Sequence, residues 1–317
     1  MASELHVIVV GRIDGDDDGD DDGDRAVEFL RDLEAHWSRF LHDSDITRLN
    51  HAAGMPVIVD PSTVTLVAAM VDAWRSTDRA FDPSILPTLI ESGYRTSIDD
   101  PYRVTFLPDG RLVVGGYDAG PTMDGIVIDT DRSTVTLPPG LVIDPGGIGK
   151  GLAADLAVRH LLSLGAAGAL VSIGGDMVMA GSPPHDATGW TVAVAHPDPG
   201  LGNLCTLLVG AGGVATSSTR SRRWIHEGRE RHHQIDPRRA EQSSTDLATV
   251  TVVARSGWLA EAHATSALLS GSHDVLGYLD DHELSGIAVA LDGNVLSTPD
   301  LSLSACDALF DAGAVAR

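Results

Sequence analysis

The stretch IDPGGIGKG, residues 143–151, carries the strongest local information on the fold, because it predicts a change from strand to helix. Apolar residues at 141–143 predict a strand before the turn, and the pattern after it predicts a helix to about Leu164. The glycines let the backbone approach a ligand closely, and the first turn of a helix presents unpaired N–H groups. Lys150 adds a positive charge there. The segment is therefore either a phosphate cradle or an ordinary tight turn.

Familiar nucleotide-binding motifs do not match this segment. A P-loop has Ser or Thr directly after its lysine, and here Gly151 follows Lys150. The GxGxxG spacing of dinucleotide-binding turns is also missing. The residues alone therefore leave the ligand open.

Strands and helices are mixed along the rest of the chain. The predicted strands are 5–10, 103–107, 111–114, 134–137, 141–143, 169–173, 190–195, 205–209, 214–217 and 247–254, and the predicted helices are 26–41, 62–78 and 259–270, before a short helix and a hairpin around Asp292-Gly293. Strict strand–helix–strand alternation does not occur. The sequence therefore predicts an α+β fold with mixed, largely antiparallel sheets and packed helices.

A carboxylate and a hydroxyl stand one helical turn apart near the C-terminal end. Glu261 and Thr265 are at positions i and i+4, so on a helix they share a face, while His263 points elsewhere. Mg²⁺ prefers oxygen ligands and leaves the rest of its shell to water and phosphates. The pair is either a magnesium site or part of a solvated helix face.

The formal net charge of −23 restricts the choice of partners. A surface this acidic repels nucleic acid, so no nucleic-acid partner is expected. A phosphorylated ligand needs local positive potential from a lysine, a helix N-terminus or a metal ion. The acidic run at 14–24 begins like a calcium-binding loop, but Arg25 stands where that loop needs a bidentate glutamate. We predict a solvated, flexible loop there.

Cysteine usage and the N-terminus bear on location. Cys205 and Cys306 are far apart and fit no zinc or redox motif, so buried free thiols are predicted. The N-terminal residues lack a basic segment followed by a long apolar one, and no window reaches the about 18 apolar residues of a membrane helix. The expectation is a cytoplasmic protein without membrane insertion.

Eight segments, in the correct order over most of the chain, resemble the FAD:protein FMN transferase family, also called the ApbE family. They are Met1–Ser3 (Met-Gly-Thr in the family), Trp37–Phe40 with Asp43–Asn50 (S-x-F and DSE-I-S-R-L-N), Ala80–Pro83 (FDPT), Asp144–Gly151 (DLGGIAKG), Ser172–Asp176 (NIGGD), Ala215–Ser217 (ATSG), His233–Arg238 (HIIDPR) and Ala260–Thr265 (ADALAT). Each motif is short, but their shared order makes the resemblance specific. It implies one ApbE-like, two-lobed domain over residues 1–317.

The resemblance implies an enzyme that uses Mg²⁺ and takes FAD as its substrate. Family members split the pyrophosphate of FAD, attach FMN through a phosphoester to a Ser or Thr of a target flavoprotein, and release AMP. Carried over to this chain, the metal ligands are the side chains of Glu261 and Thr265 and the backbone carbonyl of Gly147. Glu261 stands where the family has Asp, which keeps an oxygen ligand but lengthens it by one methylene.

The resemblance also implies contacts to FAD and a catalytic group. Lys150 is expected near the pyrophosphate, and Phe40 beside the flavin. The implied FAD-binding residues are Met1, Phe40, Ala80, Phe81, Asp82, Asp144, Lys150 and His233, and the implied catalytic residues are Asp144, Lys150 and Asp236. Either Asp144 or Asp236 could accept the proton of the incoming hydroxyl.

Some positions depart from the family pattern, and two other functions stay open. Arg239-Ala240 replaces Thr-Gly after the DPR motif, and Ser218 replaces the Gly after ATS, which bears on recognition of the acceptor protein. An FAD pyrophosphatase releasing FMN and AMP would use the same site with water as the acceptor. A non-catalytic FAD-binding protein is the third reading.

Overall fold

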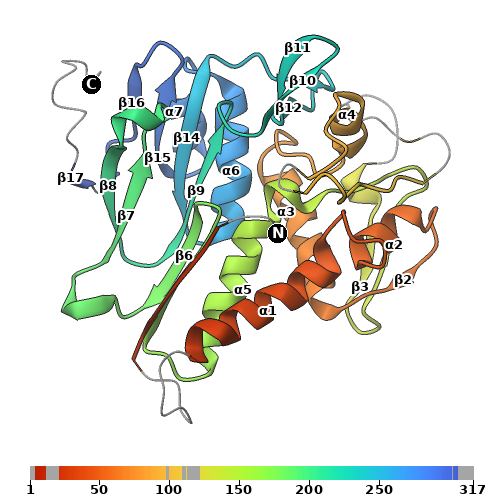
Figure 1. Ribbon diagram of the computed structural model, residues 1–317, viewed down its shortest axis with the longest axis horizontal. Helices are drawn as coiled ribbons and strands as arrows, with labels where there is room; N and C mark the ends of the chain where they lie inside the picture. The colour runs from red at the N-terminus through yellow and green to blue at the C-terminus, as the bar shows by residue number, and fades with distance from the viewer. Residues whose placement is uncertain are drawn as a thin grey trace. The chain divides into compact units, whose positions relative to one another are not determined.

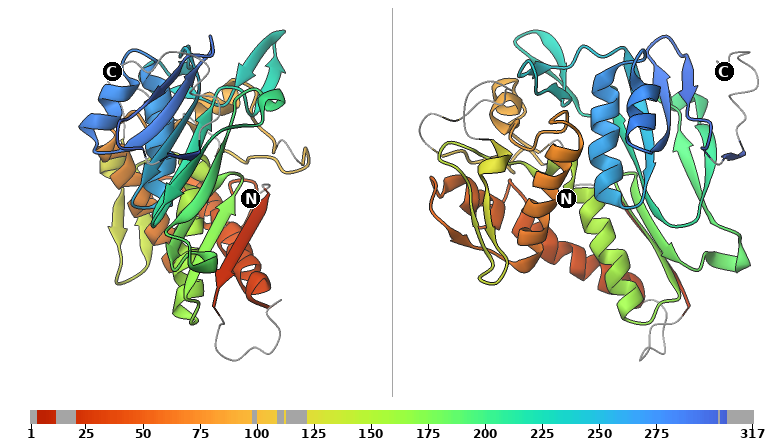
Figure 2. Two further views of the ribbon diagram at one scale, coloured as in Figure 1. Left: turned by 90° about the vertical axis from the view of Figure 1, so that its left-hand side faces the viewer. Right: turned by 180° about the vertical axis from the view of Figure 1, so that it is seen from behind.

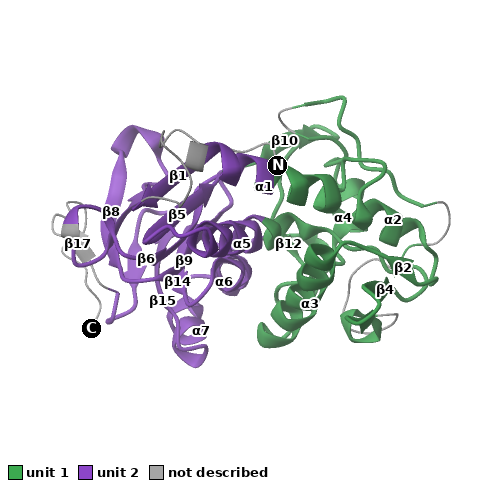
Figure 3. Ribbon diagram, turned by 90° about the horizontal axis from the view of Figure 1, so that it is seen from below, with its two compact units in different colours: residues 1–2, 30–149, 221–243 green, residues 3–29, 150–220, 244–317 purple. Residues whose placement is uncertain are grey.

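The structure, a computed structural model, describes residues 4–11, 21–97, 100–108, 112, 122–301 and 303–305 (Figure 1). Its contacts divide the chain into two units, each assembled from three separate segments. Unit 1 comprises Met1–Ala2, Leu30–Gly149 and Ser221–Ser243, and unit 2 comprises Ser3–Phe29, Lys150–Arg220 and Ser244–Arg317 (Figure 3). A single functional domain over 1–317 stays a prediction.

A seven-stranded antiparallel sheet is the largest element of unit 2. Its strands, in spatial order, are β1 (Leu5–Val10), β5 (Gly168–Ile173), β6 (Asp176–Gly181), β9 (Gly212–Ser218), β14 (Leu247–Ala254), β15 (Ser285–Ala290) and β16 (Val295–Ser297). β14 is buried on both faces, which agrees with its nearly continuous run of apolar and small residues. The α+β class predicted from the sequence is confirmed.

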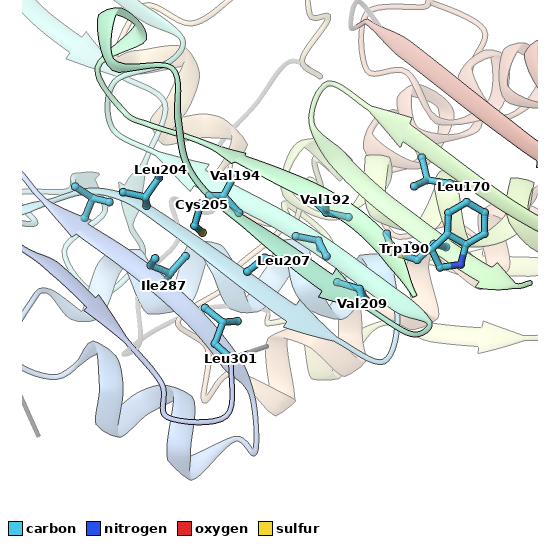
Figure 4. Close-up of a cluster of buried hydrophobic side chains, with 13 residues drawn as sticks. Leu170, Trp190, Val192, Val194, Leu204, Cys205, Leu207, Val209, Ile287 and Leu301 are labelled. Atoms are coloured by element: carbon cyan, nitrogen blue, oxygen red, sulfur yellow. The ribbon is translucent and has the colours of Figure 1, made fainter. Parts of the chain in front are cut away.

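A second, three-stranded sheet covers one face of the large sheet. Its strands β7 (Trp190–Ala195), β8 (Asn203–Val209) and β17 (Leu303–Ala305) lie in the order β17-β8-β7. One apolar cluster contains side chains from both sheets, among them Leu170 and Trp190 (Figure 4). Burial of this cluster is the main force that holds the two sheets together.

Helices α6 (Gly257–Ser270) and α7 (Val275–Asp281) cover the other face of the large sheet (Figure 2). The alternation of β15 shows the division: Ile287 and Val289 belong to the cluster between the sheets, while Ala288 packs with the helices. Unit 2 therefore has three layers, and α6 carries Glu261 and Thr265 against the sheet.

Helix α5 (Gly149–Ser163) meets α6 where both helices begin, and the contact requires glycine. A Cβ on Gly151 would lie 2.3 Å from the carbonyl oxygen of Gly257. Asp155 of α5 accepts hydrogen bonds from the N–H groups of Gly257 (2.9 Å) and Trp258 (3.0 Å), so it caps α6. Burial raises the pKa of Asp155, and the two N–H donors oppose that rise. Backbone contact and cap together fix how the two helices cross.

Unit 1 is built from short helices, a small sheet and two hairpins. Its elements are the later part of α1 (Asp21–Trp37), then α2 (Asp45–His51), α3 (Pro61–Ser76) and α4 (Leu86–Glu91), the sheet β2-β4-β3 (Val57–Ile58, Thr134–Thr136, Val127–Asp129), and the hairpins β10–β11 (Arg223–His226, Arg229–His232) and β12–β13 (Ile235–Asp236, Glu241–Gln242). Between β4 and α5 a 3₁₀ turn, η2 (Pro145–Gly147), starts the glycine-rich segment.

Two predicted strands are wrong. Residues 141–143 join no sheet, because the side-chain amide of Asn50 accepts from the N–H of Ile143 (2.8 Å) and donates to its carbonyl (2.9 Å), in place of a neighbouring strand. Residues 103–107 form only an isolated bridge between Val104 and Thr96. The predicted strand 111–114 lies outside the described residues except for Leu112.

Three smaller expectations have partial outcomes. Helix α1 begins at Asp21, so the end of the predicted loop at 14–24 is helical, and residues 14–20 lie outside the description. Cys205 is a buried free thiol as predicted, and Cys306 is not described. Within the described ranges, no helix has both the length and the apolar character that a bilayer crossing requires.

We expect Gly151→Ala to lower the free energy of unfolding by about 3 kcal/mol, because the new methyl group must displace the backbone of Gly257. Urea unfolding followed by circular dichroism measures the change. Gly277→Ala in α7 is the matched control, since a Cβ there meets nothing within 4 Å. The control should be stabilised by up to about 1 kcal/mol. Equal losses at both positions would contradict the close approach of α5 and α6.

We expect the protein to lose stability in acid through His263. Its Nδ1 lies 2.7 Å from the Tyr278 hydroxyl, and burial, with the charges of His282 and Arg255, lowers its pKa to about 4. The unfolded chain takes up that proton near pH 6.5, so the contribution of neutral His263 is complete above that pH and is lost as the pH falls toward 4. The loss reaches about 3 kcal/mol at most. A His263→Gln variant with an unchanged pH dependence of unfolding would disprove this assignment.

Candidate functional site

Lys150, the only lysine in the sequence, lies between two buried carboxylates of unit 2. Its Nζ donates to Asp176 Oδ2 and to Glu261 Oε1, the latter at 2.6 Å. Asp176 and Glu261 are each 4% exposed, and the Lys150 side chain is 16% exposed. Two carboxylates thus share one ammonium group, and the cluster carries surplus negative charge.

Local backbone geometry positions each member of this cluster. Lys150 lies in the first turn of α5, and the N–H of Gly151 donates to Glu261 Oε2 at 2.8 Å. The crossing of α5 and α6 therefore brings the two side chains together. Asp176 directly follows the turn Gly174-Gly175 between β5 and β6, where both glycines have positive φ, as a tight hairpin turn requires.

Strand β9 anchors the other side of the cluster. The N–H of Thr216 donates to Asp176 Oδ1 at 3.2 Å, and Ser217 Oγ lies 2.9 Å from Thr265 Oγ1. Thr265 stands one helical turn after Glu261 on α6. Strand β9 therefore contacts both the carboxylate of Asp176, which pairs with Lys150, and the hydroxyl of Thr265.

The electrostatics of Glu261 favour a further cation. Burial raises the pKa of Glu261, and the Asp176 carboxylate raises it further, while Lys150 and the N–H of Gly151 oppose the rise. A buried carboxylate in this state is stabilised by added positive charge. The surplus charge can be balanced by a proton or by a metal ion.

The donor set of Glu261 and Thr265 fits Mg²⁺. Among the described residues, no group of three or more His, Cys, Asp or Glu side chains could hold a metal. Mg²⁺ commonly takes only one or two carboxylates and completes its shell with water and phosphate oxygens. Glu261 retains lone pairs beyond those used by Lys150 and Gly151, and Thr265 adds a hydroxyl oxygen. Gly147 lies in unit 1, so its share in the same ion stays a prediction.

Unit 1 brings other predicted site residues together around the glycine-rich turn. The N–H of Asp144 donates to the carbonyl of Pro83 at 2.8 Å, so the Ala80–Pro83 turn lies beside the 143–151 turn. A Cβ on Gly147 would lie 2.9 Å from the ring of Phe81, which packs against that backbone. Ala80 and Phe81 are buried, and burial raises the pKa of Asp82 although Ser84 donates two hydrogen bonds to it.

Arg39 connects Asp144 with aromatic rings in unit 1. Its Nε lies 3.4 Å from Asp144 Oδ2, and its Nη1 donates to Thr105 Oγ1 at 2.6 Å. Its guanidinium carbon lies 4.3 Å from the centre of the Phe40 ring and 5.1 Å from that of Tyr94. The charge of this buried arginine is balanced by one carboxylate and two ring faces.

The remaining predicted site residues are distant in the sequence from the Lys150 cluster and from the glycine-rich turn. Asp236 accepts a hydrogen bond from the N–H of Arg238 at 3.0 Å, and His233 is half-buried just before β12. Met1 lies outside the described residues. That Met1, His233 and Asp236 belong to the same site as Asp144 stays a prediction.

Three residues that position the site received no role from the sequence. Asp176 lies inside the Ser172–Asp176 motif and pairs with Lys150, and Arg39 lies inside the Trp37–Phe40 motif and contacts Asp144. Their places within motifs are the signal that could have identified them. Asp155 gave no such signal, because its role as a cap depends on how α5 and α6 cross.

A model of the ApbE family matches residues 1–291. The chain belongs to the ApbE family. Among curated relatives, it is 27% identical to the FAD:protein FMN transferase of Klebsiella pneumoniae over 67% of this chain and 63% of that protein. It is 23% identical to the FAD:protein FMN transferase of Haemophilus influenzae over 81% of this chain and 74% of that protein. The match to the Klebsiella protein therefore spans less than two thirds of that relative.

Solved ApbE structures have the same fold. The ApbE protein of Thermotoga maritima superposes with a TM-score of 0.78 at 22% identity, covering 94% of both chains. The flavin transferase ApbE of Vibrio cholerae superposes with a TM-score of 0.73 at 20% identity, covering 97% of this chain and 95% of that one. At these identities the likeness establishes the fold, which is the ApbE fold expected from the sequence.

We expect Lys150 to react faster with an amine-acylating reagent in Asp176→Ala than in the unaltered chain. In the unaltered chain two carboxylates hold its ammonium group in a largely buried position. Peptide mass spectrometry gives the rate for this single lysine, and the N-terminal amine serves as an internal reference. Ser217→Ala is the control, because Ser217 bonds Thr265 rather than Lys150. An unchanged rate in Asp176→Ala would contradict the pairing.

Proposed function

We propose that this chain is a Mg²⁺-dependent FAD:protein FMN transferase. The names of its ApbE relatives support transfer of FMN from FAD to a protein. The observation that carries the proposal is the cluster in unit 2, where the only lysine of the chain stands at the start of α5 between Asp176 and Glu261. A helix start with a lysine suits a pyrophosphate, and surplus carboxylate charge suits the metal ion that accompanies one.

Residues of unit 1 would bind the flavin half of FAD. Phe40 is half-buried, and Arg39, which contacts Asp144 and Thr105, lies over its ring. Phe81 and Asp82 come from the turn that is bonded to Asp144. An aromatic face with nearby polar groups is the usual composition of a site for a planar ring system.

The reaction exchanges a phosphoanhydride bond for a phosphoester bond. The hydroxyl oxygen of a Ser or Thr on the acceptor flavoprotein attacks the phosphorus of the FMN half, and the P–O bond to the AMP half breaks. AMP leaves with the bonding electron pair, and the hydroxyl proton passes to a base. FMN is then joined to the acceptor through a phosphoester.

Lys150 would bind a phosphate oxygen and balance the negative charge that develops there. Asp176 holds its ammonium group in position, and the α5–α6 crossing holds Glu261 beside it. Mg²⁺ bound by Glu261 and Thr265 would supply additional positive charge at the pyrophosphate. Without these cations the acidic chain would repel its substrate.

The general base is Asp144 or Asp236. Asp144 is buried, lies 3.4 Å from Arg39 Nε and accepts a hydrogen bond from the N–H of Gly146, so its contacts favour a binding and positioning role. Asp236 is less buried and accepts from the N–H of Arg238. Asp236, the less buried of the two carboxylates, is the more accessible to an incoming hydroxyl.

Incubation with FAD, Mg²⁺ and a candidate acceptor flavoprotein should increase the mass of the acceptor by one FMN and release AMP. Intact-mass analysis with quantification of AMP distinguishes the alternatives. AMP and FMN without labelled protein would identify an FAD pyrophosphatase. Bound FAD without either product would identify an FAD-binding protein.

Glu261→Ala should reduce AMP release by about 100-fold or more, because it removes both a partner of Lys150 and the proposed metal ligand. Glu261→Asp should keep measurable turnover, since the family has Asp at this position. Glu91→Ala, an exposed carboxylate on α4, is the control and should leave the rate unchanged. Undiminished turnover in Glu261→Ala would remove Glu261 from the mechanism.

A further inference from the structure

The segment that contains β10, β11 and β12 reverses the charge of the chain locally. Residues 220–239 include only three acids, Glu227, Glu230 and Asp236. The same twenty residues hold seven of the 22 Lys and Arg residues of the chain, namely Arg220, Arg222, Arg223, Arg229, Arg231, Arg238 and Arg239. In a chain of net charge −23 this concentration of arginine in the sequence favours an anionic partner.

Several of these arginines lack a balancing acid. Arg223 pairs with Glu230 at 2.6 Å across the hairpin. Arg222 and Arg229 form no ion pair with any residue that the structure describes, and Arg229 is exposed. The Nε of Arg231 is buried without a hydrogen-bond partner. Burial and the charge of Arg223 lower the pKa of His232, so the positive charge of the hairpin comes from arginine.

An exposed apolar side chain and open strand edges on the β10–β11 hairpin favour a peptide over a small anion. Ile225 is 70% exposed in the middle of the arginines, which offers an apolar contact that an inorganic ion cannot use. The two strands pair only with each other in the described part of the chain, so each has one open backbone edge. An extended peptide can add to such an edge while its acidic side chains pair with arginine.

A series of contacts within unit 1 connects this hairpin with Asp144. Trp224 of β10 stacks on Tyr94 with ring centres 5.1 Å apart, and its Nε1 donates to the carbonyl of Ser92 at 2.8 Å. The guanidinium of Arg39 lies over Tyr94 and contacts Asp144. A peptide held on the hairpin is thus bound to the same rigid stack that positions the residues proposed to bind FAD.

We propose that the β10–β11 hairpin is the docking surface for the acceptor protein, which presents an extended segment with acidic residues flanking the Ser or Thr to be modified. The proposal rests on the proposed transferase function, because that function supplies the need for a protein acceptor. The negative charge of the whole chain disfavours a long polyanion such as nucleic acid. A short acidic segment needs only the local positive patch.

Two synthetic fluorescent peptides test the docking surface directly. Both carry one Thr at the centre, flanked by Asp in the first and by Asn in the second. Fluorescence anisotropy with the full chain measures binding without catalysis, and mass spectrometry then measures FMN transfer to each peptide. The double variant R222E/R229E reverses two hairpin charges that lack ion pairs. The control R31E/R132E makes the same change of net charge at exposed arginines of α1 and the β3–β4 turn.

We expect the Asp peptide to bind about tenfold more tightly than the Asn peptide at low salt, with a smaller ratio at high salt. R222E/R229E should remove most of this preference and raise KM for the Asp peptide about tenfold with little change in kcat. R31E/R132E should retain the preference. FAD cleavage in the absence of peptide should be equal in all three proteins.

Equal affinity for the two peptides, or equal losses in the two double variants, would overturn the docking surface. Failure of the transferase proposal gives a different result, namely no FMN on any peptide or protein and no AMP. In that case fluorescence anisotropy still shows whether the chain binds the Asp peptide more tightly than the Asn peptide. Circular dichroism of both variants should show that the substitutions leave the fold intact.

Discussion

The contact between Gly151 and Gly257 is the constraint on which the Lys150 cluster depends. Backbone meets backbone where α5 and α6 begin, and no side chain larger than hydrogen fits there. Asp155 locks the crossing by capping α6. This arrangement brings Lys150 beside Glu261, 111 residues later in the sequence, and lets Gly151 donate to the same carboxylate. Positioning by backbone contact is more exact than positioning by flexible side chains, which suits the pyrophosphate-binding role proposed for this site.

Positive charge is scarce in this protein and is concentrated at a few places. The chain carries 45 acidic residues, and its single lysine is held between two of them rather than exposed to solvent. An acidic protein that takes an anionic substrate has to concentrate positive charge at the binding site, and in the proposed function the Lys150 cluster supplies part of that charge together with the proposed metal ion. Arg39 provides a second buried charge in unit 1, balanced by Asp144 and aromatic faces. The arginines near β10 and β11 form a third concentration, at the surface.

Elements that depend on local sequence patterns were predicted well, and contacts between residues far apart in the sequence were not. The strand 5–10, the helix after Lys150 and the α+β class follow from periodicity and glycine placement, and the spacing of Glu261 and Thr265 places them one turn apart on a helix. The strand expected at 141–143 fails because Asn50, 93 residues earlier, satisfies the backbone of Ile143. The pairing of Asp176 with Lys150 and of Arg39 with Asp144 likewise depends on tertiary packing that no short window contains. The family resemblance identified the segments that carry the candidate site residues, and the structure showed which side chains contact one another.

The pairing of β1 with β5 has a consequence for the synthesis of the chain. Leu5 is matched to Ile173, so β1 has no strand partner until residues 168–173 have been translated. At a translation rate of roughly 5–20 residues per second, the apolar segment LHVIVV stays unpaired for on the order of ten seconds. An unpaired apolar segment of this kind can add to strands of other chains, and its pairing with β5 removes that exposure.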